Sequence, residues 1–292
     1  MKTSCSEFHT IRGIRHHVRL WGDAANPKLF LLHGWMDVSA SFQFLVDSLK
    51  HDWQIIAPDW RGFGLSSWSR EGYWFQDYYA DLDAILDIYS PDQPVNLVGH
   101  SMGGNVACTY TGIRPTRVRK LISLEGFGSA RNTPDMAPAR YERWLDQLKE
   151  QPAFRPYASF EAVAERLRKN NLRLSADKAG FLAQHWARQA DNGEIILRFD
   201  PRHKTVNPIM SQLDQLICCW QRITCQTLWV ISADGAIQDG RSWRKDKPAE
   251  LSERTGAFRN FSETLLEDCG HMMHHDQPQK LAAIIEAFLL TD

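Results

Sequence analysis

Short apolar runs alternate with amphipathic stretches along most of this chain. Runs of four to six apolar residues are typical of buried strands, and apolar residues spaced three or four apart are typical of helices. The expected strands are 8–11, 14–21, 29–32, 54–58, 95–98, 121–124, 227–231 and 263–266, and the expected helices around them are 41–50, 75–89, 102–113 and 279–290. The first two strands read as a hairpin about Gly13. The alternation predicts an α/β fold built on a parallel sheet.

The pattern changes in the middle of the chain. Residues 128–212 contain amphipathic helical stretches at 138–150, 159–169 and 175–188, without a buried strand run of the earlier kind. The 292 residues suffice for one core with an inserted subdomain. We therefore expect a core formed by residues 1–127 and 213–292, with a helical cap over residues 128–212.

The sequence Gly-His-Ser-Met-Gly-Gly at positions 99–104 contains the pattern Gly-x-Ser-x-Gly around Ser101. That pattern alone arises by chance in on the order of one chain in ten. Here the expected strand 95–98 leads into it and an expected helix starts at Met102, which is the context of a nucleophile on a sharp turn. The flanking glycines are needed where neighbouring backbone comes too close for a Cβ atom. Ser101 is therefore the predicted nucleophile.

A serine hydroxyl needs a base to take its proton. His271 follows Gly270 at the exit of the last expected strand, from where a loop can reach over the sheet, so we predict that His271 is the base. His274 and His275 are then expected at the surface or behind the site. His100, beside the nucleophile, is expected to serve packing, because adjacent residues on a sharp turn point apart.

A metal site is the alternative for the histidine-rich segment, since Cys269, His271, His274 and His275 have spacings that can hold zinc. No second group of ligands stands out, and zinc would leave Ser101 without a role. We expect neither a metal nor a cofactor.

A tetrahedral oxyanion needs two preorganised N–H donors. The N–H of Met102 would be one, at the start of the helix after the nucleophile, where the helix dipole helps. The N–H of Trp35 would be the other, in the loop His33-Gly34-Trp35 after the strand 29–32. The Trp35 ring would also line the acyl pocket.

The carboxylate that orients the base has two candidates, because the expected order is serine, acid, histidine. Asp234 follows the strand 227–231, and Glu125 follows the strand 121–124. Either could hold the second nitrogen of His271. Asp234 is the first choice and Glu125 the alternate acid.

These motifs resemble the α/β-hydrolase superfamily. The matching segments are 32–35, 59–66, 99–104 and 270–272, and the segments 122–128 and 198–202 are similar to its serine-hydrolase-like subfamily. The resemblance implies a mostly parallel sheet of eight strands, helices on both faces, and a helical cap inserted after the sixth strand. The family usually has Gly-x-x-Asp after its seventh strand. This chain has Asp234 one residue early, with Gly235 in the usual place, which keeps Glu125 open because some members take the acid from the sixth strand.

Composition narrows the class of partner. Hydrophobic residues make up 43% and charged residues 24%, and the formal net charge is −1, so no basic excess points to nucleic acid or an anionic membrane. The polar N-terminus shows no signal peptide, and no window approaches the ~18 apolar residues of a membrane span. The six cysteines lack a framework spacing. We expect a cytoplasmic protein.

Taken together, the motifs predict a serine hydrolase that cleaves small to medium carboxylic esters through an acyl-enzyme. The alternatives are carbon–carbon bond hydrolysis or cofactor-free dioxygenase chemistry on the same fold, because fold alone does not fix function. A binding module with an inactive pocket is a further alternative. The oligomeric state is not predicted.

Overall fold

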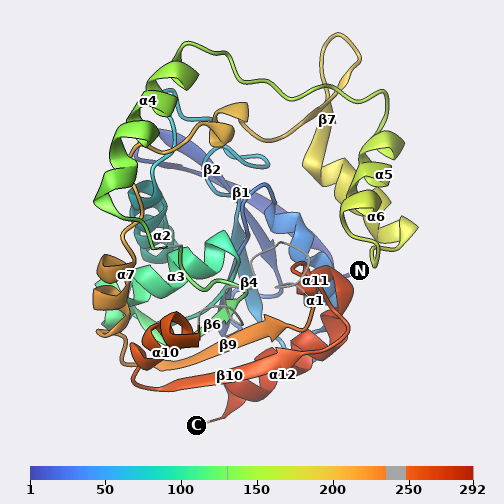
Figure 1. Ribbon diagram of the computed structural model, residues 1–292. Helices are drawn as coiled ribbons and strands as arrows, with labels where there is room; N and C mark the ends of the chain where they lie inside the picture. Colours follow the sequence, from blue (N-terminus) through green and yellow to red (C-terminus); the bar gives the residue numbers. More distant parts are fainter. Residues whose placement is uncertain (130, 235–247, 292) are drawn as a thin grey trace.

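The computed structural model describes residues 1–129, 131–234 and 248–291, and its central feature is an eight-stranded sheet (Figure 1). The strands are β1 (Ser4–Ile11), β2 (Ile14–Trp21), β3 (Lys28–Leu32), β4 (Gln54–Pro58), β5 (Val95–His100), β6 (Val118–Leu124), β9 (Gln226–Ser232) and β10 (Phe261–Leu266). Their order is β1-β2-β4-β3-β5-β6-β9-β10. Strand β2 is antiparallel to both of its neighbours, β1 and β4, and the six strands other than β1 and β2 are parallel to one another. The predicted mostly parallel sheet of eight strands is confirmed.

Helices cover both faces of this sheet. The helices of the first face are α2 (Phe75–Tyr89), α3 (Met102–Ile113), α7 (Leu213–Trp220) and α10 (Pro248–Gly256), and those of the second are α1 (Gln43–Ser48), α11 (Met273–Asp276) and α12 (Pro278–Leu290). In β3, Phe30 and Leu32 belong to the first core, whereas Leu29 and Leu31 belong to the second. Because neighbouring side chains of a strand point to opposite faces, a sheet covered on both sides needs continuous apolar runs.

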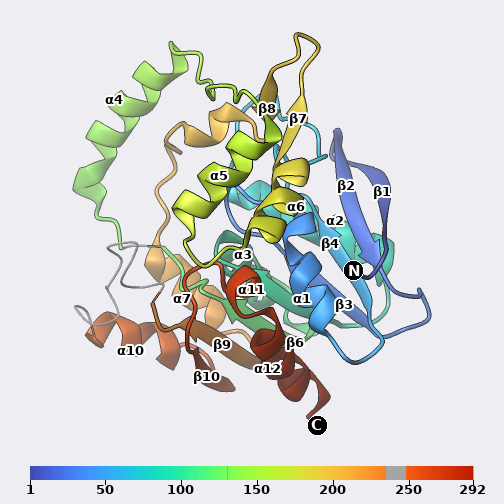
Figure 2. The same cartoon turned by 90° about the vertical axis from the view of Figure 1, so that its right-hand side faces the viewer.

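The chain leaves the sheet between β6 and α7. This excursion contains α4 (Ala137–Leu148), α5 (Phe160–Asn170), α6 (Ala176–Trp186) and a small hairpin of β7 (Ala187–Gln189) and β8 (Ile195–Leu197). The helix expected over 175–188 ends at Trp186, and the hairpin that follows is not indicated by the sequence pattern. Helices α5 and α6 pack on each other around their own apolar cluster, whereas α4 stands apart from them (Figures 1 and 2).

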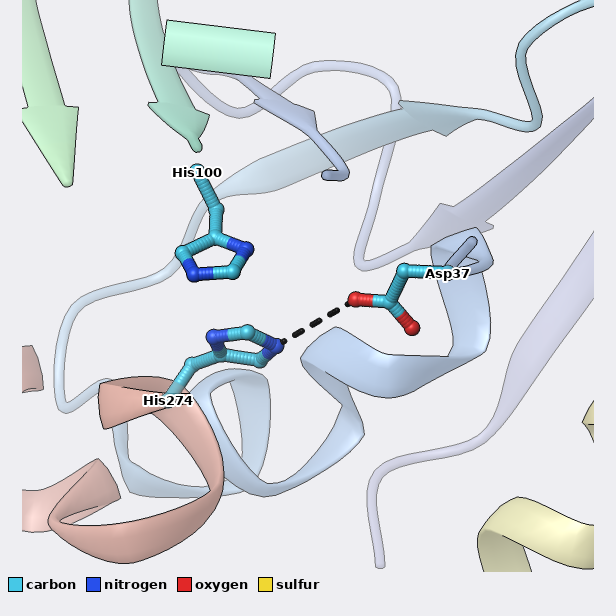
Figure 3. Close-up of side chains that lie close together, drawn as sticks. All are labelled: Asp37, His100 and His274. Atoms are coloured by element: carbon cyan, nitrogen blue, oxygen red, sulfur yellow. Dashed lines mark ion pairs between the residues drawn. The ribbon is translucent and has the colours of Figure 1, made fainter. Parts of the chain in front are cut away.

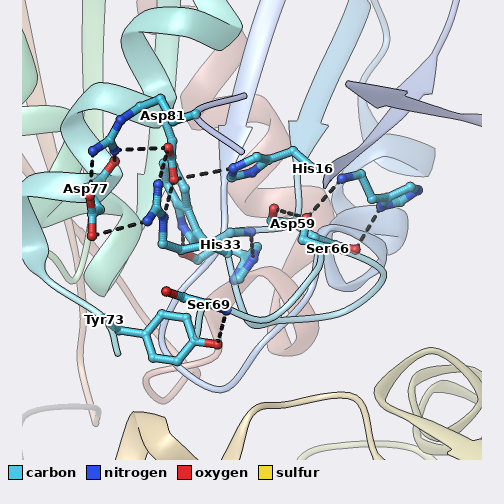
Figure 4. A network of polar contacts seen from close by, with 12 residues as sticks. His16, His33, Asp59, Ser66, Ser69, Tyr73, Asp77 and Asp81 are labelled. Carbon is cyan, nitrogen blue, oxygen red and sulfur yellow. Dashed lines mark hydrogen bonds and ion pairs between the residues drawn. The ribbon is translucent and has the colours of Figure 1, made fainter. Parts of the chain in front are cut away.

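A buried polar network braces the loop after β4 (Figure 4). The Asp59 carboxylate accepts hydrogen bonds from His17 Nδ1 at 2.7 Å and from the Leu65 N–H at 2.9 Å. Burial alone would raise the pKa of Asp59, but these donors hold it well below its usual range. Arg61 binds Asp81 through two hydrogen bonds of 2.6 Å. The loop is therefore fixed to the core rather than free to reach the site.

No helix in the described ranges is long and apolar enough to cross a membrane.

Buried imidazoles make the stability of the fold pH-dependent. Burial lowers the pKa of His33, His100 and His275 below their ordinary value of 6.5. The unfolded chain then binds more protons than the native protein as pH falls through about 6.5, so acidification favours unfolding. Between about pH 7.5 and about pH 5.5 we expect each of these imidazoles to lower the free energy of unfolding, by at most about 1.4 kcal/mol for a ring that stays neutral in the folded protein. Asp37 and Asp59, whose pKa values are lowered, lose their stabilising charge only at more acidic pH.

Urea unfolding followed by tryptophan fluorescence measures this effect, and the midpoint should fall by a large fraction between those two pH values. A midpoint that stays constant would show that these histidines do not remain neutral in the folded protein.

Candidate active site

Ser101 occupies the sharp turn between β5 and α3. Its backbone has φ 51° and ψ −113°, a conformation that is costly for a residue with a side chain. The turn is held because the Ser101 N–H donates to the Leu124 carbonyl at 2.7 Å and the Asn105 N–H donates to the Ser101 carbonyl at 3.0 Å. These two hydrogen bonds thus keep the strained backbone conformation at Ser101, the predicted nucleophile.

The glycines of the motif allow the turn to be this tight. A Cβ on Gly99 would lie 2.3 Å from the Gly103 carbonyl oxygen, and one on Gly103 would lie 2.2 Å from the carbonyl oxygen of Leu32 in β3. Both distances are impossible for real atoms, and the contacts are backbone. Glycine is therefore needed at both positions, because the start of α3 packs directly against the backbone of β3 and β5.

His271 lies in the loop between β10 and α11. Its side chain is 29% exposed, and it lines a cavity of about 810 Å³ together with Ser101. The backbone of this loop is anchored by His100, whose Nε2–H donates to the His271 carbonyl at 2.8 Å. The structure thus brings the predicted nucleophile and the predicted base to one cavity.

Glu125 follows β6 and points to His271. Its Oε2 lies 3.6 Å from His271 Nδ1, and its carboxylate is 6% exposed. The other oxygen, Oε1, accepts hydrogen bonds from the N–H and the hydroxyl of Ser232, at 2.6 and 2.8 Å. The backbone of Glu125 has φ 57°. A carboxylate held by two donors on one oxygen can present the other to an imidazole.

Asp234 lies elsewhere at the same edge of the sheet. Its carboxylate is 39% exposed and forms an ion pair with Arg173 of the excursion, with Nη2 2.5 Å from Oδ2. Its N–H donates to the Cys269 carbonyl at 3.2 Å. Gly235, which has the position usual for the acid, falls outside the described residues. Of the two candidate acids, the structure places Glu125 beside His271.

A buried cluster of Asp37, His100 and His274 lies behind the site (Figure 3). His274 Nε2 is 3.6 Å from Asp37 Oδ2, and burial opposed by this neighbour leaves the pKa of Asp37 well below its usual range. Among the described residues, this is the one group of three or more potential metal ligands whose ligand atoms all lie within 4.8 Å of one another. It differs from the zinc set weighed on the sequence, in which the Cys269 thiol donates instead to the Leu266 carbonyl.

A surface position for His274 and His275 is wrong. His274 is 0% and His275 3% exposed, because the short helix α11 packs on α1 and buries both rings. His274 lies behind the site, with its ring centroid 4.6 Å from that of His100.

The loop after β3 runs directly against the nucleophile. A Cβ on Gly34 would lie 3.2 Å from the Cβ of Ser101, so the backbone that leads to Trp35 is in contact with the turn. His33 fixes this loop, because its Nε2 accepts from the Trp60 N–H and its carbonyl from the Trp60 indole N–H, each at 2.9 Å. Trp35 itself is 52% exposed and lines the cavity. Met102 is the first residue of α3, where backbone N–H groups are free to bind an anion.

Comparisons with known proteins agree with this architecture. The model of the α/β-hydrolase fold family matches residues 27–278. A serine hydrolase-like protein of Danio rerio is 28% identical over 99% of this chain and 90% of its own length, and serine hydrolase-like protein 2 of Homo sapiens is 23% identical over 93% and 89%. Among solved structures, the thioesterase domain from the curacin biosynthetic pathway superimposes with a TM-score of 0.85 at 23% identity, covering 98% of this chain and 99% of that domain. The chain therefore belongs to the α/β-hydrolase fold family, and within that family it is similar to the serine-hydrolase-like proteins.

Proposed function

We propose that this protein is a serine hydrolase that cleaves small to medium carboxylic esters through an acyl-enzyme, with Ser101, His271 and Glu125 as the catalytic triad. The observation that carries the proposal is the Glu125 carboxylate 3.6 Å from His271 Nδ1, in a cavity that Ser101 also lines. Glu125 takes the place of Asp234, whose carboxylate is paired with Arg173.

In this mechanism the Ser101 hydroxyl oxygen attacks the ester carbonyl while His271 Nε2 takes the hydroxyl proton. Glu125 Oε2, 3.6 Å from Nδ1 in this structure, moves closer to accept a hydrogen bond from Nδ1–H, which fixes the tautomer and stabilises the imidazolium that forms. The N–H groups of Met102 and Trp35 bind the oxyanion. His271 then protonates the leaving alcohol. Water, deprotonated by the same imidazole, releases the carboxylic acid and restores Ser101.

We also propose that residues 128–212 form a cap over this site, with the core made of residues 1–127 and 213–292. Support comes from the cavity, because side chains of the excursion such as Tyr157, Trp186 and Leu197 line it together with Ser101. Helix α7, which starts at Leu213, packs against α3 and belongs to the core.

Labelling with a fluorophosphonate tests the proposal, combined with a panel of p-nitrophenyl esters of increasing acyl length. We expect one adduct, located on Ser101 by peptide mass analysis, and hydrolysis well above the buffer rate for at least the short esters. A folded protein that takes up no label and hydrolyses no ester of the panel would refute the proposed function.

A further inference from the structure

The wall of the Ser101 cavity carries three cationic side chains from separate parts of the excursion. Arg155 lies in the loop before α5, Arg166 lies on α5, and Lys204 ends the short 3-10 helix Pro201–Lys204. All three residues are exposed, and all three line the cavity that contains Ser101 and His271. Figure 2 shows α5 in front of the sheet, on the side where the excursion lies.

None of these cations is neutralised by a carboxylate in the part of the chain that the structure describes. Two other cations of the same region are paired, Arg173 with Asp234 and Arg202 with Asp200. Lys204 instead has its Nζ 4.1 Å from the centre of the Phe154 ring, which also lines the cavity. This cation–π contact holds the ammonium group at the cavity wall and leaves its charge available.

Negative charge is nearly absent from the described residues of the same cavity. Among the lining residues that the structure describes, the one carboxylate is Asp37, which is 2% exposed and faces His274 behind the site. Positive charges in a concave site raise the local concentration of anions. The guanidinium group of an arginine binds a carboxylate or a phosphate through two parallel hydrogen bonds. Because the whole chain has a formal net charge of −1, the excess of cations is a local property of this cavity and does not reflect a basic protein.

We infer, building on the proposed function, that the substrate carries an anionic group, a carboxylate or a phosphate, at a distance from the scissile carbonyl, and that Arg155, Arg166 and Lys204 bind it. The reacting ester is held at Ser101, while the anion lies against the wall formed by the excursion. Specificity then comes from this wall, and the bond cleavage comes from the core.

Two matched pairs of substrates test this inference and distinguish the sources of the anion. The first pair has acyl groups of equal length, p-nitrophenyl pentanoate and the p-nitrophenyl hemiester of glutaric acid, and places a carboxylate on the acyl side. The second pair, butyryl-pantetheine and butyryl-4′-phosphopantetheine, places a phosphate on the leaving group. We expect kcat/KM to be at least about tenfold higher for the anionic member of one pair, with a preference that falls as salt screens the charges.

A triple variant, Arg155→Gln, Arg166→Gln and Lys204→Gln, should reduce that preference to about one, because kcat/KM for the anionic member falls by at least about tenfold. Lys169→Gln is the matched control, because Lys169 is an exposed cation of α5 that does not line the cavity. The inference is overturned if neither pair shows a preference for the anion, or if the preference survives in the triple variant. Both results leave the labelling of Ser101 and the hydrolysis of neutral esters intact, so they differ from a failure of the proposed function.

Discussion

Replacing Ser101 with alanine should lower kcat/KM for the best ester at least about 10⁴-fold, since loss of the nucleophile removes the acyl-enzyme route altogether. The remaining rate over buffer would come from substrate binding and the oxyanion donors. The fold should survive, because the strained backbone at φ 51° is held by backbone hydrogen bonds to Leu124 and Asn105 rather than by the hydroxyl. Steady-state kinetics and a thermal melt of the variant measure both parts.

Ser48→Ala is a suitable control for this experiment. The Ser48 hydroxyl donates to the Phe44 carbonyl within α1, away from the cavity, so its loss should leave kcat/KM unchanged. A Ser101→Ala variant that keeps most of its activity would contradict the acyl-enzyme. It would instead favour the alternatives considered on the sequence, carbon–carbon hydrolysis or cofactor-free oxygenation, in which His271 and Glu125 act as a dyad.

The sheet could be predicted from the sequence because each of its strands has a local signal. The run 29–32 is apolar at every position, and the structure buries it on both faces. Strands β7 and β8 have three residues each, too few to show alternation, and Tyr157, which belongs to neither strand, adds a bridge to Ile195 of β8. Their existence is a result of packing inside the excursion. The sequence of that segment therefore predicts helices well and the hairpin not at all.

The candidate site likewise contains residues that local sequence patterns predict and one residue that they do not. The signals for Ser101 and His271 are local, since each follows a strand, Ser101 has a glycine two positions away on either side, and His271 follows Gly270. The choice of acid is not local: β6 and β9 are parallel neighbours, so the residues after both strands reach the same edge of the sheet. What separates the candidates is a partner for each, Ser232 for Glu125 and Arg173 for Asp234. Arg173 lies 61 positions from Asp234, and no sequence pattern announces that contact.

Glu125→Gln should lower kcat by about 10⁴-fold, the loss seen when the orienting carboxylate of a triad is replaced by an amide. The Ser232 N–H and hydroxyl would keep the amide oxygen on their side, as they hold Oε1 now, at 2.6 and 2.8 Å. The amide nitrogen would then face His271 Nδ1 and donate to it. That contact favours the tautomer with a proton on Nε2, which cannot accept the proton of Ser101.

Asp234→Asn is the matched comparison, because it makes the same chemical change at the competing position. The side chains of the ion pair between Asp234 and Arg173 are each more than a third exposed, 39% for Asp234 and 34% for Arg173. Its loss should therefore change kcat less than about threefold and the free energy of unfolding by less than about 1 kcal/mol. Thermal melts of both variants show whether the Glu125 effect is catalytic. If Asp234→Asn loses activity as severely as Glu125→Gln is expected to, the acid is Asp234, and the loop must rearrange to bring its carboxylate from Arg173 to His271 when substrate binds.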